Sequence, residues 1–277
     1  MRITLVPQVS SALPPAAFDA LMVLPGVVQR RVKERETLRV TIGGREYFLK
    51  RHFGVSLREV AKNLSQLRWP VLGADTEARG IRRLQALGVP TVSLAGEGER
   101  GLNPLRRQSF ILTEALPDTI TLEELSLRWG RQPFRSRADM LLKRALLVRI
   151  AGIARSLHEN GVNHRDFYLC HFRLEQGSPG LHRPGEALLL HVMDLHRAQL
   201  RRRTPLRWRI KDIASLYFSA LDAGLTRHDC LRFMRLYTET PLREQCGRPF
   251  WRRVSTKAEF LYRKAHGRSA KLPLEAG

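Results

Sequence analysis

Hydrophobic and polar positions alternate every second residue in much of the first half of the chain, and they follow a helical period in most of the second half. The alternation is clearest at residues 38–42 and 47–50, which are joined by Gly43-Gly44. This pattern is typical of a β-hairpin with a tight turn. With the apolar stretch that precedes it, the pattern predicts three antiparallel strands over residues 27–51.

The remaining elements follow from the same reasoning. Further strands, which are apolar segments bounded by polar, glycine or proline residues, are expected at 91–96, 108–113, 172–174 and 187–193. Helical spacing of apolar residues predicts helices over 16–24, 56–67, 74–87, 122–129, 138–160 and 208–223, with two or three more over 227–265. We therefore predict an α+β protein with a strand-rich lobe at 1–117 and a helical lobe at 118–277.

Composition and charge narrow the classes of partner. The 277 residues are 43% hydrophobic, which is enough for a real core, and the net charge is 48 − 26 = +22. Such a surface favours polyanions: nucleic acid, anionic lipid headgroups or phosphorylated sugars. Only Trp208 interrupts the most basic segment as an aromatic residue, so a stacking platform for nucleic acid is not expected.

The cysteines and the apolar segments indicate a compartment. Cys170, Cys230 and Cys246 are odd in number and have no CxxC spacing, so reduced thiols are expected rather than a disulfide framework or a zinc site. Residues 1–16 lack the apolar core of a signal peptide, and no apolar run approaches the ~20 residues that cross a bilayer. We expect a cytoplasmic protein.

The sequence His164-Arg165-Asp166 follows the helix stop at Gly161, and His171 comes five residues after Asp166. A polar side chain at that spacing, followed later by an aspartate that ends a buried strand, is typical of phosphoryl transfer in kinases. We expect Asp166 to orient and deprotonate an acceptor hydroxyl. Arg165 would steady the loop by charge pairing. A chance tripeptide in an arginine-rich chain is the alternative.

The second aspartate is Asp194, which follows the apolar run 187–193 and is the better candidate for a metal ligand. His164 could then hydrogen-bond the backbone near it. His171 stands where kinases have a metal-binding asparagine, and three roles stay open for it: metal ligand, phosphate contact or brace of the loop. Asp212 could accept hydrogen bonds from the catalytic-loop amides, or it could be a first-turn carboxylate favoured by the helix dipole.

The residues that would bind the nucleotide are predicted from a carboxylate expected to be buried. Glu77 lies on the same face of its helix as Ile81 and Leu84, and burying it without a cation would be costly. Lys50, at the end of a neighbouring strand, is the candidate partner, and such a pair holds the α- and β-phosphates of ATP in kinases. Local capping by Glu77 is the alternative. In a two-lobed kinase the backbone at Glu114 and Leu116 would bind adenine, although any strand followed by a turn could look like this segment. Lys50, Asp166 and Asp194 should converge on one crevice.

Seven cations fall within the fifteen residues 197–211, soon after Asp194: Arg197, Arg201, Arg202, Arg203, Arg207, Arg209 and Lys211. A segment in this position shapes the acceptor site of protein kinases. The charge therefore predicts an acidic acceptor, bound by Arg197, Arg201 and Arg207. A solvated basic loop is the alternative.

Several strings of the sequence closely resemble the bacterial lipopolysaccharide core heptose kinase family. They are Asn163-His164-Arg165-Asp166-Phe167-Tyr168-Leu169-Cys170-His171-Phe172, Asp194-Leu195-His196-Arg197-Ala198-Gln199, Arg207-Trp208-Arg209, Lys211-Asp212, Tyr47-Phe48-Leu49-Lys50, Ala61-Lys62-Asn63-Leu64, Pro70-Val71-Leu72-Gly73-Ala74 and Leu216-Tyr217-Phe218-Ser219-Ala220. The resemblance extends from about Leu38 to Tyr262.

The resemblance implies a protein-kinase-like two-lobed fold, use of ATP and Mg²⁺, and transfer of phosphate to a heptose of the lipopolysaccharide inner core at the cytoplasmic face of the inner membrane. It makes Asp166 the catalytic aspartate, Lys50 and Glu77 the phosphate-positioning pair, and His171 and Asp194 the metal-side residues. The substrate would be the acidic sugar-lipid, and the anionic inner-membrane surface a further partner.

Three features depart from general protein kinases. No Gly-x-Gly-x-x-Gly occurs near residues 26–37, histidine replaces the metal-site asparagine, and no Ala-Pro-Glu follows the basic segment. The alternatives are a kinase that acts on protein hydroxyls, including tyrosine, and a catalytically silent kinase-fold module that binds anionic lipid or nucleic acid. Retention of Lys50, Asp166 and Asp194 weighs against the silent module.

Overall fold

The computed structural model describes residues 1–32, 34–54, 74–103, 106–116, 118–131, 136–183, 185–244 and 249–273. The chain divides into two compact units. Unit 1 contains Met1–Gln85, Val92–Leu116 and Asp194–Arg197, and unit 2 contains Ala86–Thr91, Pro117–Met193 and Ala198–Gly277. The predicted helix over 56–67 lies outside the described residues. The proposed boundary between lobes at residue 117 stays a prediction.

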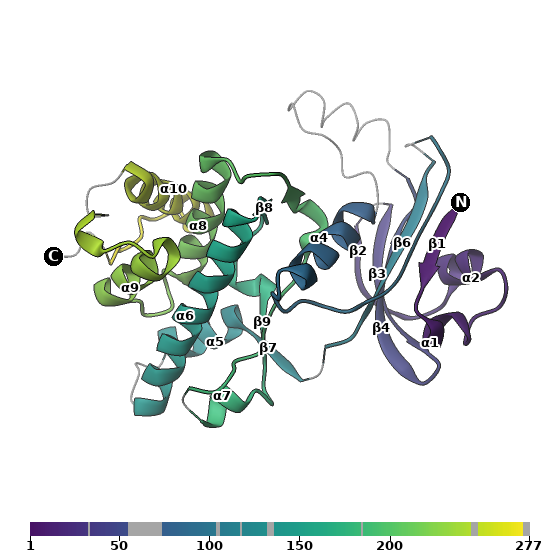
Figure 1. Ribbon diagram of the computed structural model, residues 1–277, viewed down its shortest axis with the longest axis horizontal. Coiled ribbons are helices and arrows are strands. Elements are labelled where there is room, and N and C mark those ends of the chain that lie inside the picture. Colours follow the sequence, from purple (N-terminus) through teal and green to yellow (C-terminus); the bar gives the residue numbers. More distant parts are fainter. Residues whose placement is uncertain are drawn as a thin grey trace. The chain divides into compact units, whose positions relative to one another are not determined.

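Unit 1 is built on a six-stranded antiparallel sheet with the strand order β1-β5-β6-β4-β3-β2 (Figure 1). Its strands are β1 (Arg2–Leu5), β2 (Val27–Val32), β3 (Arg35–Ile42), β4 (Arg45–His52), β5 (Leu94–Arg100) and β6 (Gln108–Glu114). The three strands predicted over 27–51 are confirmed, and the turn between β3 and β4 has φ of 56° at Gly43 and 77° at Gly44. Such angles favour glycine.

Strand β1 was not predicted, because residues 1–15 read as an extended lead-in. The strand pairs with β5, with Arg2 opposite Glu99 and Leu5 opposite Gly96. Strand β5 begins at Leu94 and continues through Arg100, so it lies later in the chain than the strand predicted at 91–96. A short edge strand such as β1 carries too few residues for a recognisable alternation, and its pairing depends on a distant segment.

The core of unit 1 joins the sheet to a short helix. Helix α2 (Ala17–Val23) contributes Phe18 and Leu21 to a buried cluster that includes Leu49 and Phe110 from the sheet. Helix α4 (Asp75–Ala86) buries Ala78, Ile81 and Leu84 together with Glu77, while α1 (Pro7–Ser10) is a single turn. The helix expected at 74–87 is thus present, with a carboxylate on its apolar face.

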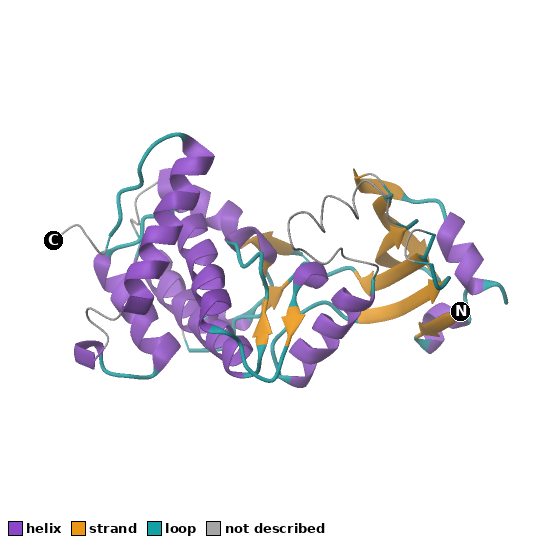
Figure 2. Ribbon diagram, turned by 90° about the horizontal axis from the view of Figure 1, so that it is seen from above, coloured by secondary structure: helices purple, strands orange, loops and turns teal. Residues whose placement is uncertain are grey.

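Unit 2 is mostly helical, as the purple ribbons of Figure 2 show. Its helices are α5 (Leu122–Arg131), α6 (Arg137–Glu159), α7 (Pro179–His182), α8 (Leu206–Ala220), α9 (Arg227–Thr238) and α10 (Pro249–His266). Helix α6 packs against α9, and α8 packs against α10. The predicted α+β class is therefore confirmed. No helix in the described parts of the chain combines the length and the apolarity needed to cross a membrane.

Two small sheets complete unit 2. One has the order β10-β9-β7, formed by β7 (Thr119–Thr121), β9 (Phe172–Glu175) and β10 (Leu190–Val192), and the other pairs β8 (Val162–Asn163) with β11 (Gln199–Leu200). Strand β10 is shorter than the run 187–193 that was predicted. A Cβ atom on Gly161 would lie 1.7 Å from the Arg201 carbonyl oxygen, and Gly161 has φ of +76°. Only glycine therefore lets the two segments of the second sheet meet here.

Candidate active site

In unit 1, the ammonium group of Lys50 on β4 lies between two carboxylates. Its Nζ atom is 2.5 Å from Oε1 of Glu77 on α4 and 3.7 Å from Oδ1 of Asp194. Burial lowers the pKa of Lys50, but the charges of Glu77 and Asp194 more than offset burial, so its pKa is raised above the ordinary value. The side chain therefore stays a cation that can bind phosphate oxygens.

Asp194 has an unusual backbone for a residue other than glycine, with φ of 59°. A short 3₁₀ turn, η2 (Leu195–Arg197), follows it, and Nδ1 of His196 lies 2.5 Å from the same Oδ1 atom that faces Lys50. The Asp194 side chain is 26% exposed. Mg²⁺ commonly binds one or two protein carboxylates and completes its shell with water and substrate phosphates, so this carboxylate fits such an ion.

Sequence reasoning missed His52, which lies two residues after Lys50 on β4. The pKa of this buried histidine is lowered to about 3 by desolvation and by the charges of Arg35, Lys50 and His196. The imidazole is therefore neutral at ordinary pH, in a neighbourhood of positive charge. Side chains two residues apart on a strand point to the same face of the sheet, so the spacing alone could have placed His52 beside Lys50.

In unit 2, the loop that carries Asp166 is held by Asp212 of α8. The Asp212 carboxylate accepts hydrogen bonds from the backbone amides of His164 (2.7 Å) and Arg165 (2.9 Å). The Asp212 side chain is only 1% exposed, and His158 lies 3.4 Å from it. Arg165 itself has φ of 73°. The buried acid thus fixes the turn immediately before Asp166.

Two histidines connect this loop to the strand that precedes Asp194. Nε2 of His164 lies 2.8 Å from the Met193 carbonyl oxygen, and the Met193 amide donates to the His171 carbonyl at 2.8 Å. Nδ1 of His171 lies 2.6 Å from the Asp166 carbonyl oxygen. Because a carbonyl only accepts, Nδ1 carries the hydrogen of this bond, which ties the His171 ring to the backbone of Asp166.

The residues predicted to bind the acceptor fall in both units. Arg197 ends the η2 turn of unit 1, whereas Arg201 and Arg207 belong to unit 2. The guanidinium group of Arg201 donates to Oδ1 of Asn163 (2.6 Å) and to Oε1 of Gln199 (2.8 Å). The guanidinium carbon of Arg207 lies 5.5 Å from the ring centroid of Trp208.

The segment expected to contact adenine begins at the last residue of β6 in unit 1. The Glu114 amide donates to the Ser93 carbonyl at 3.0 Å, and the Ala115 amide donates to the Glu46 carbonyl at 3.1 Å. These bonds fix the backbone immediately before Leu116. Adenine binding by Glu114 and Leu116 stays a prediction, as does the convergence of Asp166 with Lys50 and Asp194.

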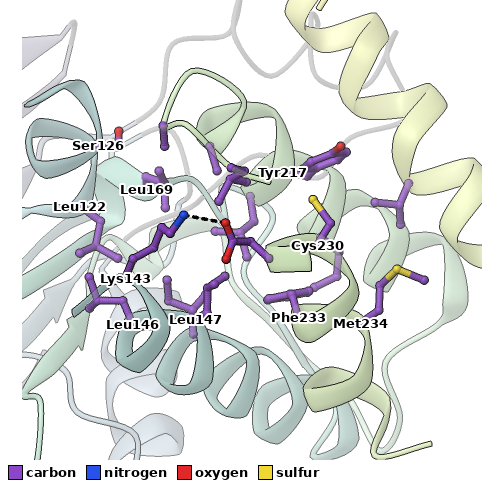
Figure 3. A pocket seen from close by; sticks show the side chains of 18 of the residues that line it. Leu122, Ser126, Lys143, Leu146, Leu147, Leu169, Tyr217, Cys230, Phe233 and Met234 are labelled. Carbon is purple, nitrogen blue, oxygen red and sulfur yellow. Dashed lines mark hydrogen bonds and ion pairs between the residues drawn. The ribbon is translucent and has the colours of Figure 1, made fainter. Parts of the chain in front are cut away.

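Unit 2 also contains an apolar cavity of about 110 Å³ that the sequence did not predict (Figure 3). Side chains such as Leu146, Leu216 and Met234 line it, and an ion pair of Lys143 with Asp229 lies in its wall at 2.7 Å. Burial tends to raise the pKa of Asp229, but its hydrogen bonds to Lys143 and Thr226 outweigh burial and lower the pKa.

Comparison with known proteins places the chain among kinases. Residues 19–237 match the model of the "Lipopolysaccharide kinase (Kdo/WaaP) family". The chain is 47% identical over 251 residues to the "Lipopolysaccharide core heptose(I) kinase WaaP" of Pseudomonas aeruginosa, covering 89% of this chain and 90% of the relative. It is also 47% identical over 228 residues to the protein of the same name from Escherichia coli K12, covering 82% and 83%.

A solved structure described as "WaaP in complex with acyl carrier protein" matches with a TM-score of 0.77 and 42% identity, covering 95% of this chain and all of that chain. This similarity bears out the predicted protein-kinase-like fold. Membership of a kinase family in turn implies that the protein uses ATP. The chain belongs to the lipopolysaccharide kinase (Kdo/WaaP) family.

Proposed function

We propose that this protein transfers the γ-phosphoryl group of ATP to a hydroxyl of a heptose in the lipopolysaccharide core. The observation that carries the proposal is the Lys50 ammonium, which is 2.5 Å from Glu77 and 3.7 Å from Asp194 in a chain of this family. A cation held between two acids on rigid elements is suited to a triphosphate and its metal.

The residues of unit 1 bind the nucleotide. Lys50, oriented by Glu77, contacts the α- and β-phosphates, and the backbone at Glu114 and Leu116 contacts adenine. Asp194 would hold Mg²⁺, and His171 stays a candidate metal-side residue. When bound, Mg²⁺ neutralises phosphate oxygens and so favours departure of ADP.

Asp166 acts on the acceptor. The heptose oxygen bonds to the γ-phosphorus as the bond to the β,γ-bridging oxygen breaks, ADP leaves with that electron pair, and the hydroxyl proton passes to the Asp166 carboxylate. His164 and Arg165 are positioning residues, because Asp212 holds their amides. In a loose transition state, positioning matters more than basicity.

The acidic sugar-lipid is attracted by Arg197, Arg201 and Arg207. A net charge of +22 also favours the anionic inner face of the inner membrane, so we infer a cytoplasmic protein that binds this surface peripherally. A liposome flotation assay with anionic and neutral vesicles tests this, and equal binding to both would contradict it.

An acyl carrier protein is a second candidate partner, because the similar WaaP structure contains one. The apolar cavity of unit 2 offers a hydrocarbon chain a dry environment (Figure 3). Calorimetry should then show tighter binding of the acylated carrier than of the unacylated carrier. The variant Ala223→Phe, which fills the cavity, should remove the difference.

The function is tested with purified core oligosaccharide and labelled ATP. Phosphate should appear on heptose with the wild type and vanish with Asp166→Asn, while the exposed control Asp118→Asn stays active. Mass spectrometry of the product locates the phosphate. Transfer to protein only, including tyrosine, or absence of nucleotide binding would overturn the proposal.

A further inference from the structure

Four cationic side chains surround the indole ring of Trp208 in unit 2. The distances to its ring centroid are 5.1 Å from Cζ of Arg165, 5.9 Å from Cζ of Arg201, 5.5 Å from Cζ of Arg207 and 5.8 Å from Nζ of Lys211. The side chains come from the catalytic loop, from the segment after β11 and from α8. One aromatic ring therefore gathers charges that are far apart along the chain.

Two of the four cations, Arg201 and Arg207, have no carboxylate beside them among the described residues. Arg201 bonds only the neutral oxygens of Asn163 and Gln199, and no ion pair of Arg201 or Arg207 with a carboxylate occurs within the described parts of the chain. The pKa of Arg201 is lowered by burial and by the neighbouring charge of Arg207. Like charges held together in this way are stabilised by a bound anion.

The start of helix α8 adds to the same imbalance. Its first turn contains no acidic residue, although a carboxylate there is the usual complement to the helix dipole. Instead, Arg207 and Trp208 occupy this turn, and the N-cap residue, Pro205, makes no side-chain hydrogen bond to it. The backbone amides at the start of α8 and the nearby arginine and lysine side chains therefore both favour an anion at this end of the helix.

The backbone that carries the cluster is fixed. The Arg201 amide donates to the Gly161 carbonyl at 2.9 Å, and Nζ of Lys211 donates to the Arg165 carbonyl. The Arg165 amide is in turn held by Asp212 at 2.9 Å. Because the parts are ordered before a ligand arrives, binding costs little reorganisation.

We propose that Arg201 and Arg207, with Arg165 and Lys211 around Trp208, bind a carboxylate or phosphate substituent of the acceptor and so select acidic sugar chains. The proposal rests on the proposed function. Planar guanidinium groups donate two parallel hydrogen bonds to either oxyanion. Since Arg165 immediately precedes Asp166 in the chain, an acceptor anchored here is held beside the catalytic loop.

Arg207→Gln is the central variant, because Arg207 has no hydrogen bond to the protein among the described residues, and Arg203→Gln is its matched control. Arg203 lies in the same segment and carries the same charge, but it is not one of the cations over the Trp208 ring in the described structure. We expect Arg207→Gln to raise the KM for core oligosaccharide by roughly tenfold while the KM for ATP and kcat stay near wild type, since one charged hydrogen bond is lost. Arg203→Gln should change the KM for oligosaccharide by less than about twofold.

Chemically altered acceptors identify the anion. Oligosaccharide whose carboxyl groups are reduced to alcohols, and oligosaccharide stripped of phosphate, are compared as substrates for each variant. If the carboxylate is the ligand, only carboxyl reduction should remove the difference between wild type and Arg207→Gln, and the converse holds for phosphate. If neither treatment does so, or if both arginine variants behave alike, the proposal is wrong.

A binding measurement separates this proposal from the kinase assignment. Titration of the protein with core oligosaccharide should change the fluorescence of Trp208, and the change should disappear in Trp208→Phe and weaken in Arg207→Gln. This signal is expected even if phosphate transfer fails. Transfer without any Trp208-dependent signal would leave the kinase assignment intact and overturn the anion site.

Discussion

The Lys50 ammonium lies 2.5 Å from Glu77, whose side chain is 5% exposed on the otherwise apolar buried face of α4. The pair explains why a carboxylate is tolerated at this position, because a buried charge needs a partner with good geometry. It also keeps Lys50 protonated and directed toward Asp194, which is 3.7 Å away. Nucleotide binding should therefore depend on both members of the pair.

Glu77→Gln should lower kcat/KM for ATP about ten- to a hundredfold, because a charge-assisted hydrogen bond that orients Lys50 is lost. Steady-state kinetics with varied ATP measures the effect. The matched control is Glu123→Gln, an exposed residue in the first turn of α5, which should leave the kinetics unchanged. Equal kinetics for Glu77→Gln and the control would contradict a role for the pair.

Asp212→Asn should lower kcat far more than the KM for ATP. The asparagine oxygen can still accept one amide hydrogen, but its NH₂ group then faces the other amide, so one of the two bonds to the loop is lost. We also expect a loss of about 1–3 kcal/mol in the free energy of unfolding. Kinetics and urea unfolding test this, with Asp118→Asn as the exposed control, and an unchanged kcat would rule out a positioning role.

His171→Asn should keep the kinase active and change its metal preference. Asparagine can also donate to the Asp166 carbonyl, which Nδ1 of His171 contacts at 2.6 Å, but it offers an oxygen ligand in place of a softer nitrogen. The ratio of activity with Mn²⁺ to activity with Mg²⁺ should therefore fall. An unchanged ratio, together with lost activity only in His171→Ala, would indicate that His171 braces the loop and does not bind metal.

The Lys143–Asp229 pair predicts a defined acid sensitivity. The folded-state pKa of Asp229 is lowered, so the pair contributes stability above the unfolded pKa of about 4 and loses it as the pH falls through the folded value. Lys143→Met should cost about 3–5 kcal/mol at pH 7 by leaving a buried charge. In this variant the free energy of unfolding should also decrease less steeply than in the wild type as the pH falls below about 4.

Lys143→Met/Asp229→Asn is the control for this experiment. The double variant removes both charges but keeps a side-chain oxygen for Thr226, which completes the capping box of α9. Most of the stability at pH 7 should return. If the double variant is as unstable as Lys143→Met, packing rather than charge explains the loss.

The sequence predicted those parts that depend on local patterns. Strands β3 and β4 follow from alternation around Gly43-Gly44, and the partner of Glu77 follows from a carboxylate on an apolar helical face. Strand β1 and the pair β8–β11 were missed, because segments of two to four residues have no period and pair with distant segments.

Features that depend on tertiary packing were also missed. The grouping of four cations around Trp208 joins positions from 165 to 211, and the positively charged surroundings of His52 include residues from 35 to 196. The apolar cavity depends on how the helices of unit 2 pack. The positions of apolar residues in the sequence do not distinguish a filled core from one that contains a cavity.

Two of the three non-glycine residues with positive φ in the described structure are Arg165 (73°) and Asp194 (59°). Such a backbone costs a residue with a side chain roughly 1–2 kcal/mol relative to glycine. Glycine at position 165 would therefore relax the turn and increase the stability of the folded protein. Glycine at position 165 would remove the cation beside Trp208, so a substitution that increases stability here would reduce activity.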